Sequence, residues 1–191
     1  MLNVANKQEI RKHLKALRSQ MTAEYVAQSS NMAAQQILAC DAYQKAKLIM
    51  GYLAFGKEVS VDTVLLQALA DGKQVVVPFI TSDTEMEAAL LRNMQDLCLD
   101  RYGIRCVCKP PDLIDPEQID LILVPGVAFA LDGSRMGMGA GYYDRFLQRC
   151  PMAATIGIAY EKLLQDSLPT DEYDIPVQYL ACEAWIRKLH P

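Results

Sequence analysis

The stretch IDLILV, residues 119–124, decides the fold class. Apolar side chains stand on both faces of the strand that this stretch predicts, which is typical of a strand in the middle of a parallel sheet. Pro125 and Gly126 follow at once and end the strand. A second stretch, QVVVPFI at residues 74–80, also predicts a strong strand. The core is therefore expected to contain a sheet of buried strands.

Helical and strand-like stretches alternate around these two strands. Apolar residues at helical spacing predict a helix over residues 7–20. Thr22 is a suitable N-cap for a second helix that runs to about Leu38. Ser60 is a suitable cap for a third helix, over residues 61–70, and Gly72 is a suitable end signal for it. Further elements are expected as strands over residues 47–53, 155–160 and 177–181, a helix over 142–149, and either a strand or a helix over 86–92.

This alternation predicts an α/β fold, a three-layer sandwich with a mainly parallel central sheet covered by helices on both faces. Residues 1–191 are expected to form a single domain, because no repeat, low-complexity segment or long linker divides the chain. Ligands of such folds bind beyond the carboxyl ends of the strands. The loops after Leu53, Val124 and Tyr160 are therefore expected to line the site.

The composition limits the classes of partner. The chain is 51% hydrophobic and 22% charged with a net charge of −4, which gives no general reason to bind nucleic acid or an anionic membrane. No apolar run reaches the roughly 18–20 residues needed to span a bilayer, and the N-terminus lacks the order of a signal peptide. The six cysteines include no C-x-x-C pair, so we expect reduced thiols, mostly in the core. A cytoplasmic monomer without nucleic-acid or membrane partners is expected.

The sequence GSRMGMGAGYYDRF, residues 133–146, carries the strongest functional pattern. Alternating Gly137, Gly139 and Gly141 remove side chains from a turn, so that consecutive backbone N–H groups can converge on an anion. A helix expected from Tyr142 adds a helix N-terminus, which favours phosphate. Asp144 could face a metal ion, and Arg135 could face a transferring phosphoryl group. The pattern is neither a dinucleotide fingerprint nor a Walker A loop, and an ordinary flexible loop is the alternative.

Two further groups of residues could complete a ligand site. The first helix places Lys7, Arg11, Lys15 and Arg18 on nearly one face, so Lys7 and Arg11 could reach the same polyphosphate. The alternative is a solvated amphipathic face. Glu58 follows the first strand and could accept paired hydrogen bonds from an amino-pyrimidine edge. The alternative for Glu58 is ordinary solvation or a charge at a helix N-terminus.

Residues 124–147, VPGVAFALDGSRMGMGAGYYDRFL, resemble the signature of the 5-formyltetrahydrofolate cyclo-ligase family, which is approximately P-G-x-A-F-x-x-x-G-x-R-L-G-x-G-x-G-Y-Y-D-R. The resemblance extends over most of the chain. KQEIRKHLKALR (7–18) is similar to the basic N-terminal helix of the family, and GYLAFGKEVSVDT (51–63) to its substrate loop. QALADGKQVVVP (67–78) and LPTDEYDIPV (168–177) resemble a helix–strand unit and the closing segment.

The resemblance implies an enzyme that uses ATP and Mg²⁺ to convert 5-formyltetrahydrofolate, a reduced folate, into 5,10-methenyltetrahydrofolate. It implies ATP-binding roles for Lys7, Arg11, Arg135, Met136, Gly137, Met138, Gly139, Ala140, Gly141, Tyr142 and Tyr143. It implies folate-binding roles for Leu53, Glu58, Met138, Gly139, Ala140, Gly141 and Tyr142. Arg135 and Tyr143 are the expected catalytic residues, with Arg135 stabilising the transferring phosphoryl group, and Asp144 is the expected Mg²⁺ ligand.

The chain also departs from the family pattern. Met138 and Ala140 stand where many members have Arg or Lys, which predicts a weaker hold on ATP. Tyr173 precedes Asp174 where His is common, and RCVCKP (105–110) replaces a Glu-Pro sequence. Two other functions stay open at this point. One is a different enzyme of the same fold that handles ATP or phosphate, and the other is a non-catalytic folate or nucleotide sensor.

Overall fold

The structure is a computed structural model that describes residues 4–108 and 110–189. Its centre is an eight-stranded sheet with the strand order β12-β11-β10-β7-β1-β2-β3-β6. The strands are β1 (Leu48–Met50), β2 (Gln74–Ile80), β3 (Met86–Leu91), β6 (Leu113–Ile114), β7 (Leu121–Val124), β10 (Ala154–Ile158), β11 (Tyr179–Ala181) and β12 (Ile186–Lys188). The five strands from β11 to β2 run parallel, and β12, β3 and β6 pair antiparallel at the two edges.

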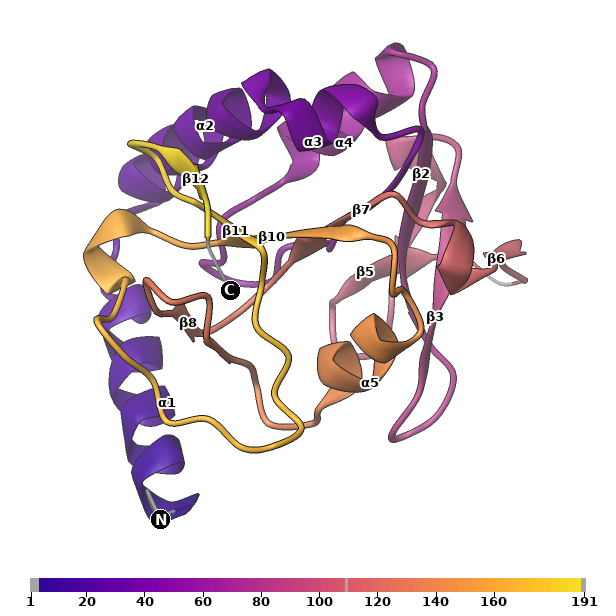
Figure 1. The fold of residues 1–191 in the computed structure, drawn as a ribbon. Helices are drawn as coiled ribbons and strands as arrows, with labels where there is room; N and C mark the ends of the chain where they lie inside the picture. The colour runs from indigo at the N-terminus through magenta and orange to yellow at the C-terminus, as the bar shows by residue number, and fades with distance from the viewer. Residues whose placement is uncertain (1–3, 109, 190–191) are drawn as a thin grey trace.

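Helices cover both faces of this sheet, so the predicted α/β sandwich is confirmed (Figure 1). One face carries α2 (Ala23–Ala39), α3 (Asp41–Lys45) and α4 (Asp62–Ala70). The other face carries the short helix α5 (Tyr142–Gln148), and the chain between β7 and α5 packs beside it. The two layers are thus unequal, and the thinner one leaves room for a site.

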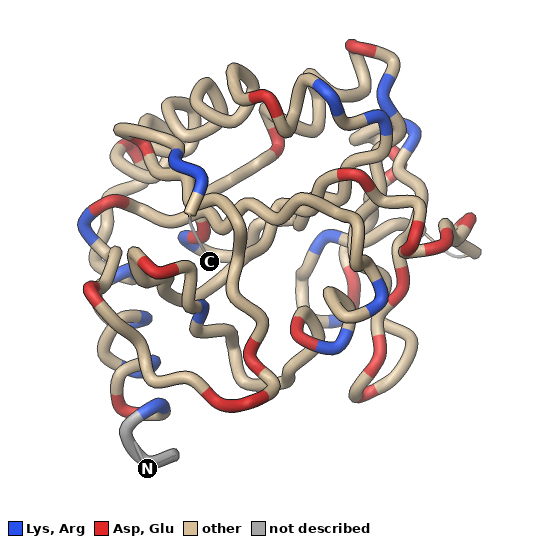
Figure 2. The backbone as a smooth tube through the Cα atoms, in the orientation of Figure 1, with Lys and Arg blue, Asp and Glu red and all other residues tan. Residues whose placement is uncertain are grey.

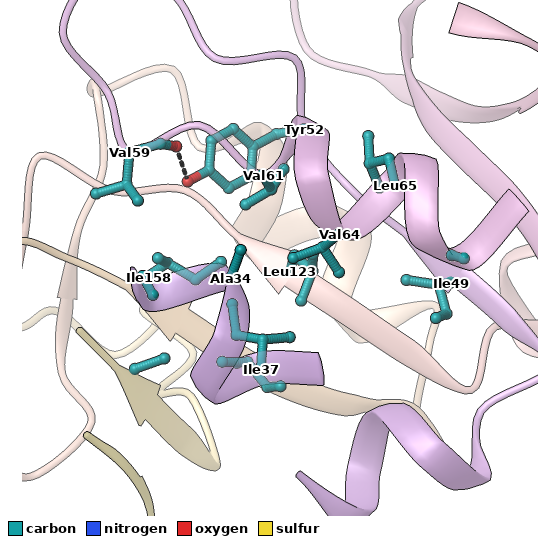
Figure 3. Close-up of a cluster of buried hydrophobic side chains, with 14 of the residues drawn as sticks. Ala34, Ile37, Ile49, Tyr52, Val59, Val61, Val64, Leu65, Leu123 and Ile158 are labelled. Atoms are coloured by element: carbon teal, nitrogen blue, oxygen red, sulfur yellow. Dashed lines mark hydrogen bonds between the residues drawn. The ribbon is translucent and has the colours of Figure 1, made fainter. Parts of the chain in front are cut away.

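Alternating side chains of the central strands build two cores. Ile49 of β1 and Val75 of β2 point into the cluster under α2 and α4, whereas Met50 and Val76 point into the cluster on the α5 side. Figure 3 shows how Ile37 and residues of α4 lie over the first of these clusters. Each fully buried apolar side chain of this size contributes roughly 1.5–3 kcal/mol relative to an exposed one. The sheet is stabilised because apolar side chains are buried on both of its faces.

Local signals explain where several elements begin and end. Thr22 is the N-cap of α2, and its hydroxyl accepts a hydrogen bond from the backbone N–H of Tyr25 at 3.1 Å, as predicted. Gly72 follows α4 with a φ of +75°, a conformation that favours glycine. Ser60 is not the cap residue of α4, because that position belongs to Val61. The Ser60 hydroxyl nevertheless accepts the N–H of Asp62 at 3.2 Å.

A hairpin and the first helix lie outside the sheet and shape its carboxyl edge. The hairpin consists of β8 (Ala128–Phe129) and β9 (Arg135–Met136), which pair antiparallel. Helix α1 (Val4–Ser19) packs on it through Leu14, which belongs to a small apolar cluster with Val127 and Met136. The basic side of α1 is thereby placed next to the glycines that follow β9.

The observed elements differ from the predictions mainly in length. The strands expected over residues 47–53, 119–124, 155–160 and 177–181 are β1, β7, β10 and β11, each shorter than expected, whereas β2 has the predicted bounds. Residues 86–92 form a strand, β3, because they pair along β2 over six positions. The elements without a counterpart in the prediction are α3, β6, β8, β9, β12, the hairpin β4 (Leu97–Leu99) and β5 (Arg105–Val107), and the 3₁₀ turns η1 (Met94–Asp96), η2 (Pro116–Gln118) and η3 (Glu161–Leu163).

The cysteines also differ from expectation. All six are reduced, as predicted, but only Cys150 and Cys182 are buried. Cys108 is exposed, and the remaining three are half-buried. The expectation that most of the thiols lie in the core was therefore wrong, because several stand on short peripheral elements. Within residues 4–108 and 110–189, no helix has the length and apolar character needed to cross a bilayer.

Candidate active site at the carboxyl edge of the sheet

A cleft of about 830 Å³ opens at the carboxyl edge of the parallel strands. Leu53 and Glu58, after β1, and Pro125 and Gly126, after β7, line it. Asp174, from the long loop between β10 and β11, lines it too. All three loops that the fold class predicts therefore contribute to the cleft.

Every residue that the sequence suggested for the site lines this one cleft. These residues are Lys7, Arg11, Leu53, Glu58, Arg135, Met136, Gly137, Met138, Gly139, Ala140, Gly141, Tyr142, Tyr143 and Asp144. They come from α1, from the loop after β1 and from the segment between β9 and α5. Segments more than a hundred residues apart in sequence thus meet around one volume large enough for a small-molecule ligand.

The glycine loop, residues 137–141, depends on the absence of side chains. Gly139 has a φ of +109° and Gly141 a φ of +69°, both in the region that other residues rarely adopt. Gly141 is also the N-cap of α5 and supplies no capping side chain. The loop can therefore follow this tight path only with glycine at these positions.

Two arginines donate hydrogen bonds to carbonyl groups of the glycine loop. The Nε of Arg11 donates to the carbonyl of Gly137 at 2.8 Å, and Arg145 donates to the carbonyl of Ala140 at 2.7 Å. In a trans peptide the N–H of the next residue points away from the carbonyl. The N–H groups of Met138 and Gly141 therefore point away from these arginines, which suits a loop that offers amide donors to an anion.

Arg135 and Asp144 form an ion pair that the sequence did not indicate. A terminal nitrogen of Arg135 lies 2.6 Å from Oδ1 of Asp144, and the two side chains are 5% and 19% exposed. The backbone N–H of Ile175 donates to the same oxygen at 3.3 Å. Asp144 thus orients the Arg135 guanidinium within the cleft wall and leaves Oδ2 as its other ligand atom.

Two buried donors in this wall lack an acceptor. Among the described residues, only the Nε of Arg135 and the hydroxyl of Tyr143 are buried side-chain nitrogen or oxygen atoms without a hydrogen-bond partner. Leaving such a group unsatisfied costs roughly 1–3 kcal/mol. Burial raises the pKa of Tyr143 far above its usual value, although Arg135 lowers it, so the hydroxyl keeps its proton at neutral pH. The wall of the cleft therefore holds two buried donors without a partner.

Glu58 lies in the floor of the cleft with a basic partner. Its Oε1 is 3.6 Å from a terminal nitrogen of Arg18, and the side chains are 13% and 10% exposed. Its Oε2 accepts the backbone N–H of Phe55 at 3.1 Å. Arg18 also donates to the carbonyl of Gly126 at 3.2 Å. Arg18 therefore ties α1 to the cleft floor and balances the charge of Glu58.

Lys7 reaches the cleft but is held by two carboxylates. Its ammonium group lies 2.6 Å from both Asp171 and Asp174. Burial lowers the pKa of Lys7, but the hydrogen bonds to Asp171 and Asp174 outweigh that effect and raise it overall. Figure 2 shows Lys and Arg at several points along α1. A polyphosphate that binds Lys7 must therefore share the lysine with these carboxylates or displace them.

Several lining residues were missed by sequence reasoning. Asp171 and Asp174 were noticed only as part of a closing segment. Arg18, which pairs with the lining residue Glu58, was noticed only as part of a basic face. The remaining missed residues belong mainly to β2 and to the β4–β5 hairpin: Pro78, Phe79, Ile80, Asp100, Arg101, Tyr102, Ile104, Arg105 and Cys106. Nothing in the spacing of these residues marks them as neighbours, because the sheet edge alone brings them together.

The fold and the cleft define a class of protein: an open α/β protein with an anion-binding glycine loop, basic side chains and carboxylates at the carboxyl edge of its parallel sheet. Comparison with known families narrows this class. Residues 3–183 match the model of the 5-formyltetrahydrofolate cyclo-ligase family. The chain belongs to this family.

Individual relatives agree with this assignment. A 5-formyltetrahydrofolate cyclo-ligase of Haemophilus influenzae is 28% identical over 181 residues, which covers 92% of this chain and 97% of the relative. The mouse protein of the same name is 26% identical and covers 93% of both chains. A solved structure of 5,10-methenyltetrahydrofolate synthetase from Aquifex aeolicus superposes with a TM-score of 0.86 at 30% identity, covering 100% of this chain and 94% of that one.

Proposed function

We propose that this protein converts 5-formyltetrahydrofolate and ATP into 5,10-methenyltetrahydrofolate, ADP and phosphate. This is the activity after which its relatives are named. The observation that carries the proposal is the pair of unsatisfied buried donors, Arg135 Nε and Tyr143 Oη, in a cleft beside the glycine loop. Buried donors without acceptors are expected where a ligand brings oxygen atoms.

The chemistry needs positioning rather than an enzyme nucleophile. The formyl oxygen attacks the γ-phosphorus of ATP, and ADP leaves. The phosphorylated formyl group is then attacked at carbon by N10 of the same folate, which loses its proton, and phosphate departs with the former formyl oxygen. An amide-like oxygen is a poor leaving group, whereas phosphate is a good one. The protein must hold the two reactants in line and stabilise charge on the transferring group.

Arg135 and Tyr143 have the geometry for the charge stabilisation. Asp144 fixes one end of the Arg135 guanidinium at 2.6 Å, so the unpaired Nε–H is held in a set direction. Tyr143 keeps its proton because burial raises its pKa. Donors that are fixed before the reaction stabilise developing charge without reorganisation. We assign both donors to oxygen atoms of the transferring phosphoryl group or of the formyl group.

The remaining loop and helix residues are assigned to ATP. We assign the segment between Arg135 and Tyr143 to the phosphates of ATP; its residues are Met136, Gly137, Met138, Gly139, Ala140, Gly141 and Tyr142. Lys7 and Arg11 supply positive charge from α1. Arg11 binds the loop carbonyl through Nε alone, so its terminal nitrogens are the groups offered to phosphate. Arg is suited to such bidentate contacts, and Lys acts as a point charge.

Leu53 and Glu58 are assigned to the folate, together with the loop residues from Met138 to Tyr142. Glu58 is half-buried and carries a carboxylate in the cleft floor, where an amino-pyrimidine edge could donate paired hydrogen bonds to it. Arg18 offsets the cost of burying this carboxylate. Replacing Glu58 should therefore weaken folate binding more than ATP binding.

The wall around Asp144 fits a Mg²⁺ ion that arrives with ATP. Mg²⁺ is usually held by one or two carboxylates together with substrate phosphates and water. Asp144 keeps one carboxylate oxygen beside the glycine loop, and Asp174 lines the same cleft. When bound, the ion supplies neutralisation of charge on the phosphates. No group of three or more His, Cys, Asp or Glu side chains with metal-binding geometry occurs in the described ranges.

The charge of the chain bears on its partners. A net charge of −4 favours neither nucleic acid nor an anionic membrane as a partner. We propose that the protein acts on a soluble reduced folate as a cytoplasmic monomer.

The test is a direct assay. Purified protein, MgATP and 5-formyltetrahydrofolate are mixed, and near-ultraviolet absorbance is followed for the methenyl product. Product formation that requires both substrates is expected. Binding of either ligand without turnover would favour a sensor. Turnover of ATP without methenyl product would favour another phosphate-handling enzyme.

A further inference from the structure

Three cysteines stand together on the β4–β5 hairpin. Cys98 of β4 lies directly opposite Cys106 of β5 in the register of this antiparallel pair. Cys108 follows Cys106 by two residues and stands just beyond the end of β5. Cys98 and Cys106 therefore stand side by side on the two-stranded ribbon with Cys108 next to its end, although the sequence spacing of the three cysteines gives no C-x-x-C motif.

The thiols are also in contact. The sulfur atoms of Cys98 and Cys106 are 3.8 Å apart. The neighbouring Cys98 thiol raises the pKa of Cys108, which places the two side chains close together. Opposite residues of an antiparallel pair have Cα atoms about 4.5 or 5.5 Å apart. A disulfide accepts Cα separations of about 4.4–6.8 Å, so the backbone can stay in place and only side-chain rotations are needed.

The cluster borders the functional cleft. Cys106 lines it, and so does the hairpin turn through Arg101, Tyr102 and Ile104. Cys108 is exposed and gives a reagent access to the cluster. A covalent change at these thiols would therefore join the two strands that carry one wall of the cleft.

We propose that Cys98, Cys106 and Cys108 form a thiol–disulfide exchange site that takes a low-molecular-weight disulfide and closes a Cys98–Cys106 disulfide. The thiolate of Cys108 attacks one sulfur of the reagent, which releases one thiol and leaves a mixed disulfide on Cys108. Cys98 attacks the Cys108 sulfur and releases the second thiol. Cys106 then attacks the Cys98 sulfur, which forms the Cys98–Cys106 bond and returns Cys108 to the thiol state. Two protein thiols are oxidised and one reagent disulfide is reduced to two thiols, so electrons and protons balance.

The other cysteines lack this arrangement. Cys150 and Cys182 are buried, and burial raises the pKa of both, that of Cys150 to about 12. Cys40 is half-buried at the end of α2, as Cys98 is on its strand, but it has no thiol neighbour among the described residues. Cys40→Ser is thus the matched control for Cys98→Ser. Oxidation of these cysteines does not require the proposed enzymatic activity.

The experiment treats the reduced full-length protein with oxidised glutathione at about pH 8.5, where more of each thiol is ionised. Protein thiols, released glutathione and intact mass are measured. Cleavage with trypsin after Arg101 and Arg105 puts Cys98 on a different peptide from Cys106 and Cys108. The expected result is a loss of two thiols, a release of two glutathione molecules per protein, and a cross-linked pair of these peptides that dithiothreitol separates.

Variants decide which sulfur atoms are joined. Cys98→Ser should give no cross-link and retain a glutathione adduct, whereas Cys40→Ser should behave as wild type. Cys108→Ser should still form the cross-link, at least several-fold more slowly, because Cys106 and Cys98 remain. Wild-type protein that ends as a glutathione adduct without a cross-link would overturn the proposal. Loss of the cross-link in Cys108→Ser would overturn the assigned pair, and its persistence in Cys98→Ser would overturn the site.

Discussion

The two walls of the cleft differ in how they are built. The wall from Arg135 to Asp144 is partly buried, contains left-handed glycines and keeps two donors unsatisfied. The wall formed by the β4–β5 hairpin is open to solvent, and its Tyr102 is 67% exposed. Within residues 4–108 and 110–189, buried side-chain donors without a partner occur only in the first wall. The proposed reaction is therefore assigned to the first wall, while the second wall carries the cysteines proposed to exchange with a disulfide.

The largest expected effect comes from removing the fixed cation of the first wall. Arg135→Ala should lower turnover by about a thousandfold, because removal of a preorganised donor costs on this scale. Arg135→Lys keeps the charge but loses the Nε donor, so it should recover only part of the rate. Steady-state kinetics with both substrates measures this. Full activity of Arg135→Lys would show that charge alone matters there.

Asp144 should rank next, because it both orients Arg135 and faces the proposed metal. Asp144→Asn keeps the shape of the side chain and should lower turnover by about a hundredfold, with little change in folate affinity. A titration with Mg²⁺ should show a higher requirement than wild type. Equal losses of turnover and folate affinity would contradict a role in the phosphate chemistry.

Tyr143 offers a test that separates function from stability. Tyr143→Phe removes only a buried hydroxyl that has no partner in the free protein. Turnover should fall about tenfold to a hundredfold, since a hydrogen bond to a charged group is worth roughly 1.5–3 kcal/mol. The melting temperature should stay equal or rise, because an unsatisfied donor disappears. A large drop in melting temperature with unchanged turnover would assign the hydroxyl a structural role instead.

Met138 tests the unusual composition of the glycine loop. Its side chain is 51% exposed in the cleft, at a position where the family resemblance leads us to expect a basic residue. Met138→Arg should lower the KM for ATP about threefold, in line with an exposed ion pair worth up to roughly 1 kcal/mol. An unchanged or higher KM for ATP would refute the idea that the loop holds ATP weakly. Met138→Gln adds polarity without charge and serves as the control.

The smallest effect is expected at the second wall. Arg105 forms a two-point ion pair with Asp62, at 2.7 and 3.0 Å, which anchors the hairpin to α4. Arg105→Gln should cost about 0.5–1 kcal/mol in urea unfolding, because both side chains are partly exposed. Turnover should change less than twofold. A loss of turnover as large as that expected for Tyr143→Phe would contradict the assignment of the reaction to the first wall alone.

The sequence predicts the elements whose signals are local. Thr22 as a cap, Gly72 as a helix end and the bounds of β2 follow from residue types and their order. The glycine loop is also predictable from the sequence, because alternating glycines indicate a tight turn with exposed backbone N–H groups. The predicted site residues do gather in one cleft, although their chemical roles stay predictions.

Long-range pairing escapes sequence reasoning. The ion pairs of Arg135 with Asp144 and of Arg18 with Glu58 depend on the angle at which α1 and α5 meet the sheet. Strands of two or three residues, such as β8 and β5, are too short to show a period. Cys98 and Cys106 become neighbours only because such strands pair.

The most direct test of the central claim follows the formyl oxygen. 5-Formyltetrahydrofolate labelled with ¹⁸O in its formyl group is incubated with the protein and MgATP, and the released inorganic phosphate is analysed by mass spectrometry. Phosphorylation of the formyl oxygen predicts one ¹⁸O atom in each phosphate released with the methenyl product. Unlabelled phosphate accompanying the same product would contradict the account.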